Sequence, residues 1–267
     1  MKKIKFYCVT DKLINFVNKD GYSFGWVGKN EAPKSYIKCN DKKNIFDKEQ
    51  YYSELTFHYW YWKNLLDLEK EDQWIGFCQK RRYWLNDLKD ENITVNNINK
   101  HLLVNFKDEW TNYESLICEP IKISGAKKIK LIKRGWKNII KKPSILFNEK
   151  SQNIALHFDM HHGYGNLDKA IQLLAEDDRS DFSDFVNSKN SFNPHIMFIT
   201  KKKIMNRWFG ILFPWLKRCE NEFGFKNLKG YDMTRIYAFL AERYLSFWFK
   251  KYTKVKENPW VFLDINR

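Results

Sequence analysis

The sequence predicts an α/β protein of one domain, because strand-like apolar runs and amphipathic helical patterns intermingle along the chain. Its 267 residues suffice for a sizeable core, and 43% of them are hydrophobic, which excludes a disordered chain. Only 11 glycines and 6 prolines occur, too few for a turn-dense all-β protein. No internal repeat or interdomain linker interrupts the pattern, so we expect a single domain over residues 1–267.

Apolar runs and helical spacing place the expected elements. Strands are predicted at residues 3–10, 25–28, 73–78, 116–118 and 195–200, with Lys- and Asn-rich loops up to about residue 49. The aromatic run 51–66 is apolar nearly all round, which predicts a buried helix. Further helices are predicted after the capping residue Asn166, over 204–219 with a kink at Pro214, and over 236–248 after the capping residue Asp232.

The charge balance indicates an anionic partner. Forty-seven Lys and Arg residues against 32 Asp and Glu residues leave +15, which favours nucleic acid, phosphates or an anionic membrane surface. The five cysteines are scattered and never spaced as a metal or redox pair, which indicates a reducing compartment. The N-terminus lacks the apolar stretch of a signal peptide, and no run reaches the ~18 apolar residues of a transmembrane helix. We therefore expect a cytoplasmic protein, at most peripheral on the inner face of the cytoplasmic membrane.

The segment 122–142 stands apart, because no acidic residue occurs between Glu119 and Glu149. Built as a helix, it places its apolar residues on one side with cations flanking them, which is typical of a helix that binds a membrane surface. An ordinary surface helix packed on the domain explains the pattern equally well, and no recognition motif supports nucleic-acid binding. The cations are Lys122, Lys127, Lys128, Lys130, Lys133, Arg134, Lys137, Lys141 and Lys142, and the apolar residues are Ile129, Ile132, Trp136, Ile139 and Ile140.

Two adjacent arginines follow the predicted strand 73–78. Arg81 and Arg82 therefore lie beyond the carboxyl end of a strand, where open α/β sheets bind their ligands. Guanidinium groups offer paired donors that match phosphate oxygens. The structural alternative is an ion pair with Asp87 or Glu91.

A dense group of imidazoles and a carboxylate occurs at His157, Asp159, His161 and His162. On a strand, the first three would share one face and would suit zinc or a two-metal centre. Their order and spacing match no well-known metalloenzyme motif, and such histidines also serve in hydrogen bonding or acid–base chemistry. No glycine-rich phosphate loop and no nucleophile elbow is present.

Charged residues also interrupt two apolar helical patterns. Glu242 and Arg243 stand within Phe-Leu-Ala-Glu-Arg-Tyr-Leu, where a charged pair is either a buried salt bridge or part of a site. Asp168 falls in the first turn of its helix, where a negative charge is favourable in itself.

Six segments recur together in an order and spacing that resemble one family. They are Tyr52-Ser53-Glu54-Leu55-Thr56; Tyr61-Trp62-Lys63-Asn64; Ile75-Gly76-Phe77-Cys78 with Arg81-Arg82-Tyr83; His162 with Asn166-Leu167-Asp168; Pro194-His195 with Met197-Phe198-Ile199; and Phe239-Leu240-Ala241-Glu242-Arg243. They resemble the bacterial capsular-polysaccharide and lipooligosaccharide glycosyltransferases, formerly labelled a domain of unknown function. The resemblance extends from the first strand to about residue 250. It implies a single GT-A-like domain with a mixed central sheet flanked by helices.

The resemblance also implies a nucleotide-sugar donor and its contacts. The nucleotide would lie at the end of the first strand, in contact with Val9 and Thr10. Arg81 and Arg82 would neutralise the diphosphate leaving group, with Lys63 as a helper. GT-A enzymes usually carry Asp-x-Asp there for a divalent metal, whereas this chain has Gln79-Lys80-Arg81-Arg82. We therefore expect that no metal or other cofactor is required.

The catalytic and acceptor residues follow from the same resemblance. Asp168 is expected to be the base for the acceptor hydroxyl, with His162 as the alternative. Glu242 is a further catalytic candidate, and His195 is expected to contact the acceptor.

The chain departs from the family at three places. Gln79-Lys80 stands where members carry His-Tyr, Ile196 stands where they carry Asn, and Asn166 replaces the first Asp of Asp-Leu-Asp. The first two departures fall at expected substrate-lining positions, so we expect the sugar specificity of this chain to differ from that of other family members.

The expected activity is the transfer of a sugar from a UDP- or GDP-linked donor to a hydroxyl of a capsular polysaccharide or lipooligosaccharide acceptor. The transferase would be of the hexosyl, galactofuranosyl or heptosyl type. The acceptor is expected to be lipid-linked and the anionic membrane surface to be a partner, whereas nucleic acid is not. Two rivals stay open: a metal-dependent hydrolase using His157, Asp159, His161 and His162, and a non-catalytic nucleic-acid-binding protein.

Overall fold

The computed structural model describes residues 2–87, 92–124, 128–148 and 151–264. The chain packs into two compact units, each made of separated segments. Unit 1 comprises Met1–Glu119, His195–Ile211 and Phe249–Arg267, and unit 2 comprises Pro120–Pro194 and Leu212–Trp248. The single domain expected over residues 1–267 stays a prediction.

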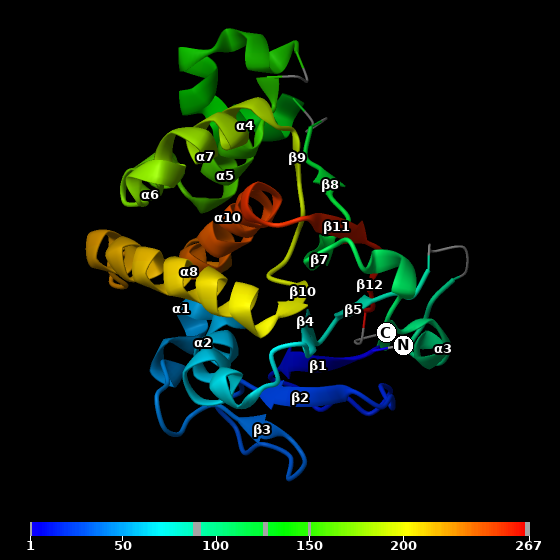
Figure 1. Ribbon diagram of the computed structural model, residues 1–267. Coiled ribbons are helices and arrows are strands. Elements are labelled where there is room, and N and C mark those ends of the chain that lie inside the picture. Colours follow the sequence, from blue (N-terminus) through cyan, green and yellow to red (C-terminus); the bar gives the residue numbers. More distant parts are fainter. Residues whose placement is uncertain (1, 88–91, 125–127, 149–150, 265–267) are drawn as a thin grey trace. The chain divides into compact units, whose positions relative to one another are not determined.

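Unit 1 is built on a mixed sheet whose strand order is β11-β7-β10-β4-β1-β2-β3 (Figure 1). β1, β2, β3 and β4 run parallel to one another, whereas β10 is antiparallel to β4 and to β7. The strands are β1 (Lys2–Thr10), β2 (Tyr22–Trp26), β3 (Ile37–Lys38), β4 (Trp74–Gln79), β7 (Ser115–Cys118), β10 (Phe198–Lys201) and β11 (Val255–Asn258). Three short strands lie off this path, namely β5 (Arg82–Trp84), β6 (Asn105–Phe106) and β12 (Trp260–Phe262).

The centre of this sheet is buried on both faces, which explains the apolar runs that predicted β1 and β4. On one face Phe6 and Cys8 pack in an apolar cluster of buried side chains. On the other face, Tyr7 packs against α2 (Leu55–Asn64), and its ring centroid lies 4.7 Å from that of Tyr61. All five cysteines of the chain are free and buried, so they act as small hydrophobic side chains.

Unit 2 consists mainly of helices. They include α4 (Lys128–Lys141), α5 (Ile154–His162), α6 (Asn166–Gln172), α7 (Glu176–Ser188) and α9 (Tyr231–Thr234), and α8 (Lys202–Phe223) and α10 (Ile236–Tyr252) have residues in both units. A two-stranded ribbon pairs β8 (Ile121–Lys122) with β9 (Ser191–Phe192). Aromatic rings fill the core of unit 2. The ring centroid of Tyr244 lies 4.8 Å from that of Trp215 and 5.2 Å from that of Phe182.

The predicted α/β class and the mixed sheet flanked by helices are confirmed, with local corrections. The helix predicted over 51–66 is interrupted, because α1 (Glu49–Tyr52) ends at Ser53, whose φ of 51° lies in the left-handed region. The cap of α6 is Gly165 and not Asn166.

The helix expected to begin at Asp232 is divided into α9 and α10. Pro214 lies inside α8, and the kink expected there stays a prediction. No helix in the described part of the chain is long and apolar enough to cross a membrane.

Candidate active site

The parallel strands of unit 1 end at one edge of the sheet, and charged residues follow them there. β1 and β4 are in register, with Val9 opposite Gln79, and the backbone N–H of Lys80 donates to the carbonyl of Val9 at 3.1 Å. The Lys80 ammonium forms an ion pair with Asp11, which ties the ends of the two strands together. Burial raises the pKa of Asp11, but the hydrogen bond and charge of Lys80 outweigh it and hold that pKa below its ordinary value.

Arg81 and Arg82 lie in the tight hairpin that joins β4 to β5 at this edge. Arg82 pairs with Gln79 across the hairpin, and its Nη1 donates to the Gln79 amide oxygen at 3.1 Å. The guanidinium carbons of Arg81 and Arg82 lie 5.3 and 5.4 Å from the ring centroid of Phe262, which is 44% exposed. Phe262 thus supports both cations from one side.

Of the two expected ion-pair partners of these arginines, one lies among the described residues. Asp87, one proposed partner, binds Lys107 at 2.8 Å instead. Glu91, the other, lies outside the described residues. The Nε atom of Arg81 is buried and has no hydrogen-bond partner among the described residues.

His195 lies in unit 1, just before β10. Because β10 runs antiparallel to β4, its first residues lie at the edge where β4 ends, the edge that also carries the two arginines. The His195 backbone is held at a φ of 68°, and its ring meets that of Trp260 edge-on at 4.6 Å between centroids. The structure therefore brings His195 to the same sheet edge as Arg81 and Arg82.

β12 completes this edge, and our sequence interpretation missed it. Trp260 pairs with Trp84 and Phe262 pairs with Arg82, so this short strand delivers both aromatic rings to the site. The apolar run Trp-Val-Phe after Pro259 was the available signal, but its pairing partner is more than 170 residues away in the sequence.

Val9 and Thr10 lie at the expected edge, but their side chains are buried. The Thr10 hydroxyl accepts a hydrogen bond from the Lys12 N–H at 2.9 Å and donates to the Lys12 carbonyl at 2.7 Å. The two residues therefore hold the turn after β1, and their contact with a nucleotide stays a prediction.

An open pocket lies beside them, at the ends of β2 and β3. Its volume is about 200 Å³, and its lining includes Trp26, Gly28, Lys29, Asn30, Glu31, Ala32, Lys38, Cys39, Asn40 and Phe46. Sequence analysis missed this pocket, because β3 was assigned to a loop.

Lys63 is not brought to the arginines. It lies in the last turn of α2, a helix that leads toward the amino end of β4, whereas the arginines follow the carboxyl end of that strand. Its ammonium nitrogen lies 3.2 Å from the ring centroid of Trp62, and the Trp62 indole N–H donates to Asn206 at 2.7 Å. Burial and the neighbouring charge of Lys43 lower the pKa of Lys63.

In unit 2, Asp168 is exposed in the first turn of α6, and Asp159 organises the turn before it. The Asp159 carboxylate accepts hydrogen bonds from the Asn138 amide at 2.6 Å and from the Gly165 N–H at 3.0 Å. Burial raises the pKa of Asp159, and the charge of Asp168 adds to this effect against the two hydrogen bonds. The hydrogen bond to Tyr164 and the charges of both aspartates raise the pKa of Lys141.

His162 is held as a neutral imidazole. Its Nδ1 lies 2.9 Å from the carbonyl of Asp232, so this nitrogen carries the proton, and its ring stacks on Phe239 at 4.0 Å. Burial, together with the charge of Arg243, lowers the pKa of His162 to about 2. Such a weakly basic group is a poor proton acceptor, which favours Asp168 over His162 as the base.

Glu242 and Arg243 form an ion pair, and Arg243 is only 2% exposed. The Arg243 guanidinium packs 4.5 Å from the Phe192 ring, and its Nη2 lies 3.3 Å from Nδ1 of His157. The structure thus contains the buried salt bridge that was one of two interpretations, and a catalytic role for Glu242 stays a prediction.

The proposed metal cluster does not form. Residues 154–162 are a helix and not a strand, so Asp159 binds Asn138 while His162 stacks on Phe239. Across the described ranges, no group of three or more His, Cys, Asp or Glu side chains is placed to hold a metal ion. The geometry required by the hydrolase rival is therefore absent from these residues.

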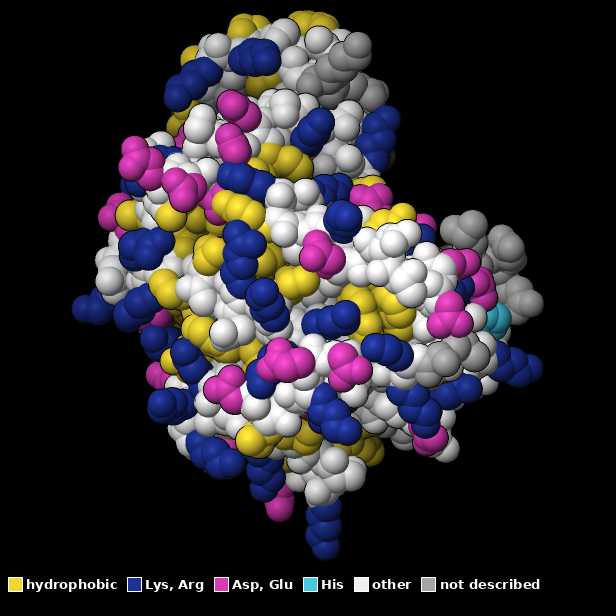
Figure 2. Space-filling view, in the orientation of Figure 1, with side chains coloured by type: hydrophobic (Ala, Val, Ile, Leu, Met, Phe, Trp, Pro, Cys, Tyr) yellow, Lys and Arg dark blue, Asp and Glu magenta, His cyan; other side chains and the backbone are white. Residues whose placement is uncertain are grey.

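The basic segment 122–142 contains α4, and the short helix Pro143–Leu146 follows it; the apolar residues of these two helices, together with Phe147, divide between two faces. Leu131 and Ile145 are buried against α5, with Ile139 packed beside them. The exposed fractions on the other face are 55% for Ile132, 53% for Trp136, 70% for Ile140 and 81% for Phe147. This segment is bright green in Figure 1, and Figure 2 shows hydrophobic and basic side chains side by side over it. Lys127 lies outside the described residues, as do the side chains of Lys128, Ile129 and Lys130.

The fold is that of a glycosyltransferase structure. It matches a solved structure described as the WbbM bifunctional glycosyltransferase in its apo form, with a TM-score of 0.71 and 19% sequence identity. The match covers 98% of this chain and 46% of that chain, so this chain spans less than half the length of that protein.

A family model matches residues 5–254, and the chain belongs to that family, which is described as a domain of unknown function, DUF4422. The comparison with curated proteins gives no match.

Proposed function

We propose that this protein transfers a sugar from a nucleotide-diphosphate donor to a hydroxyl group of a glycan. The observation that carries the proposal is the placement of Arg81 and Arg82 in the β4–β5 hairpin, beyond the carboxyl ends of β1 and β4. Paired guanidinium groups match phosphate oxygens, and this edge is where α/β sheets bind ligands. The glycosyltransferase fold of the structural neighbour supports the same class of reaction.

The residues at the end of β4 fit a diphosphate better than a divalent metal. Gln79, Lys80 and Arg81 stand where an acidic pair would hold a metal, and cations there repel a second cation. Fixed positive charge beside the departing diphosphate stabilises the charge that develops on the leaving group. We therefore propose leaving-group stabilisation by Arg81 and Arg82 without a metal.

The pocket at the ends of β2 and β3 suits the nucleoside part of the donor. It adjoins the same edge of the parallel strands, and its lining combines the Trp26 ring with polar groups such as Asn30 and Asn40. Val9 and Thr10, which are buried at the end of β1, would then support the turn beside this pocket.

For the acceptor, we propose Asp168 as the base that removes the hydroxyl proton. Its carboxylate is exposed, and the turn that presents it is fixed by the hydrogen bond from Gly165 to Asp159. His195, fixed against Trp260, is proposed to contact the acceptor. The resemblance to capsular-polysaccharide and lipooligosaccharide enzymes supports a lipid-linked surface glycan and a hexosyl, galactofuranosyl or heptosyl donor.

A thermal-shift screen tests the donor class. A ligand that binds only the folded state raises the melting temperature. At least one UDP- or GDP-sugar should do so in the presence of EDTA, whereas CMP-sugars, which lack a diphosphate, should not. A protein stabilised by none of the diphosphate sugars, or by CMP-sugars alone, would contradict the proposal.

We also propose that the exposed face of α4 docks on an anionic membrane surface. Ile132, Trp136 and Ile140 are exposed along α4, which kinks at Gly135, and Lys133 and Lys137 are adjacent to Ile132 and Trp136 in the sequence. Each cation near an anionic surface contributes ~1 kcal/mol, and apolar side chains add insertion. Docking there would place the enzyme beside a lipid-linked acceptor.

Co-sedimentation with liposomes tests this docking. The protein should bind vesicles with anionic lipid at low salt, be released by added salt, and ignore zwitterionic vesicles. Replacing Lys133, Lys137 and Lys142 with Gln should abolish binding, whereas the same change in net charge at Lys203, Lys226 and Lys229 should not. Equal loss in both variants, or tighter binding to duplex nucleic acid than to vesicles, would contradict a dedicated membrane face.

A further inference from the structure

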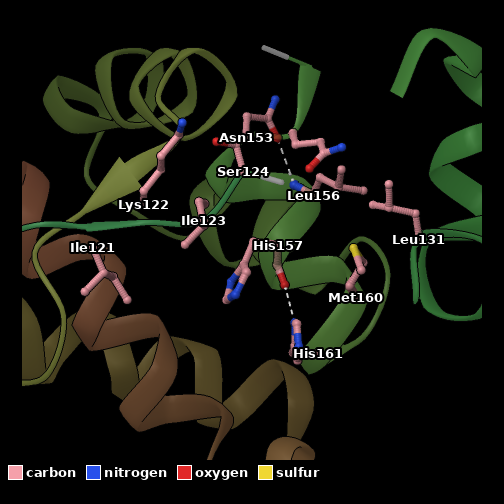
Figure 3. A pocket seen from close by; sticks show the side chains of 11 residues that line it. Ile121, Lys122, Ile123, Ser124, Leu131, Asn153, Leu156, His157, Met160 and His161 are labelled. Atoms are coloured by element: carbon pink, nitrogen blue, oxygen red, sulfur yellow. Dashed lines mark hydrogen bonds between the residues drawn. The ribbon is translucent and has the colours of Figure 1, made fainter. Parts of the chain in front are cut away.

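Unit 2 contains a second pocket that the proposed reaction does not yet use. It lies between the segment that carries β8, the start of α4 and one side of α5, and its volume is about 280 Å³ (Figure 3). Small-ligand sites begin at ~300 Å³, so this pocket suits one ring and not a chain. Its lining residues are Ile121, Lys122, Ile123, Ser124, Leu131, Gln152, Asn153, Leu156, His157, Met160 and His161.

Two histidines on one side of α5 give the pocket a hydrogen-bonding wall. His157 and His161 are one helical turn apart, and their ring centroids lie 4.6 Å from each other (Figure 3). Nη2 of Arg243 lies 3.3 Å from Nδ1 of His157. An arginine can only donate, so His157 Nδ1 accepts and its proton is on Nε2.

His161 has the opposite tautomer. Its Nδ1 lies 2.9 Å from the backbone carbonyl of His157, and a carbonyl can only accept, so this nitrogen carries the proton. In the neutral ring Nε2 of His161 is then an acceptor. The wall therefore combines a donor on His157 with an acceptor on His161, side by side.

The remaining lining adds one more polar group and an apolar surface. The Ser124 hydroxyl oxygen is buried and has no hydrogen-bond partner among the described residues. Leu131, Leu156 and Met160 belong to an apolar cluster of unit 2 and also line the pocket. Lys122 is the one Lys or Arg among the described lining residues, so the pocket is not built for a phosphate.

We propose that this pocket binds a single sugar ring of the acceptor glycan, an inference that rests on the proposed glycosyl transfer. Neighbouring hydroxyls of a sugar each donate and accept, which matches the pair of His157 and His161, while the C–H face of the ring packs on apolar side chains. The short turn between α5 and α6 connects His161 to Asp168, the proposed base. The pocket thus selects the acceptor, and the cationic edge of unit 1 selects the donor.

Saturation-transfer NMR with simple glycosides tests this assignment. The probes are the methyl glycosides of glucose, galactose, mannose and N-acetylglucosamine, each titrated into the full chain. His161→Phe keeps a planar ring but removes the acceptor, and Ser124→Ala removes the hydroxyl without adding bulk. His101→Phe in unit 1 is the matched control, and circular dichroism melts verify that all variants are folded.

At least one glycoside should show transfer to its ring protons with the wild-type protein. Its affinity should fall about tenfold in His161→Phe, the cost of one unmade hydrogen bond, and also fall in Ser124→Ala. His101→Phe should bind like the wild type. If no glycoside binds, or if folded His161→Phe and Ser124→Ala bind as the wild type does, the assignment is overturned.

A nucleotide-sugar thermal shift on the same proteins separates this inference from the proposed function. The melting temperature can rise normally with UDP- or GDP-sugars while both pocket variants bind the glycosides with wild-type affinity. This result rejects the sugar pocket and still supports the proposed glycosyl transfer. Glycoside binding that depends on His161, without any nucleotide-sugar shift, supports the sugar pocket and rejects the proposed donor.

Discussion

Arginines occur in two contrasting settings in this protein, one in each unit. Arg243 is 2% exposed, pairs with Glu242 and is enclosed by aromatic rings in unit 2. Arg81 and Arg82 are half-buried at the open edge of a sheet, beside the exposed ring of Phe262. The buried charge of Arg243 has the Glu242 carboxylate as its partner, whereas Arg81 and Arg82 lie at the sheet edge where we propose that the donor diphosphate binds. The same residue type therefore stabilises the fold in one unit and is proposed to bind substrate in the other.

The largest expected effect is on stability, at Arg243. Arg243→Met leaves the Glu242 carboxylate buried without its cation, which should lower the free energy of unfolding by ~3–5 kcal/mol in urea titrations. The double variant Glu242→Leu with Arg243→Met removes both charges and should recover most of this loss. Arg218→Met, an exposed arginine of α8, is the control. If the free energy of unfolding of Arg243→Met lay within ~1 kcal/mol of the wild-type value, Arg243 would not differ from the edge arginines in its contribution to stability.

The edge arginines should show the reverse behaviour. Arg81→Ala or Arg82→Ala should lower turnover by about 10²–10³-fold, since each removes a donor that we propose stabilises the charge developing on the leaving group. Melting temperatures should change little, because neither residue is part of the core. Arg207→Ala, an exposed arginine also in unit 1, should keep full turnover. Variants that melt early but turn over at the normal rate would instead make the pair structural.

At the proposed base, Asp168→Asn keeps the size of the side chain and removes its charge. Turnover should fall by ~10²-fold or more, with little change in donor binding measured by thermal shift. His162→Gln should cost less, because a histidine whose pKa is lowered to about 2 is already a poor base. A larger loss in His162→Gln than in Asp168→Asn would reverse the assignment.

The smallest expected effect concerns the ion pair that ties β1 to β4. The pKa of Asp11 is below its ordinary value in the folded state, so its stabilising contribution is present above the unfolded pKa of 3.8 and is lost as pH falls through the folded value. The pair is partly exposed, so Asp11→Asn should lower stability at pH 7 by at most ~1 kcal/mol. The difference in the free energy of unfolding between Asp11→Asn and the wild type should vanish in acid. A difference that grows below pH 4 would contradict the lowered pKa of Asp11.

Sequence patterns located the strands that carry local signals and missed those that depend on distant partners. The apolar runs at 3–10 and 73–78 became β1 and β4, because both lie in the centre of the sheet. β3 and β12 were missed, since two- and three-residue strands have no period of their own and exist through pairing.

The candidate site shows the same division between local and distant information. The position of Arg81 and Arg82 followed from one strand end, so it could be predicted. The separation of Lys63 from them depends on the direction of α2, and the neutral state of His162 depends on burial and Arg243. Neither fact is readable from spacing along the chain.

Isothermal titration of UDP and GDP in EDTA tests the central claim most directly, because it isolates recognition of the diphosphate from catalysis. The account predicts that at least one of the two nucleotides binds the wild-type protein without metal. Its affinity should fall at least tenfold in Arg81→Ala and in Arg82→Ala, and stay unchanged in Arg207→Ala. Binding that disappears in EDTA and returns with Mn²⁺, or that ignores both edge arginines, would contradict it.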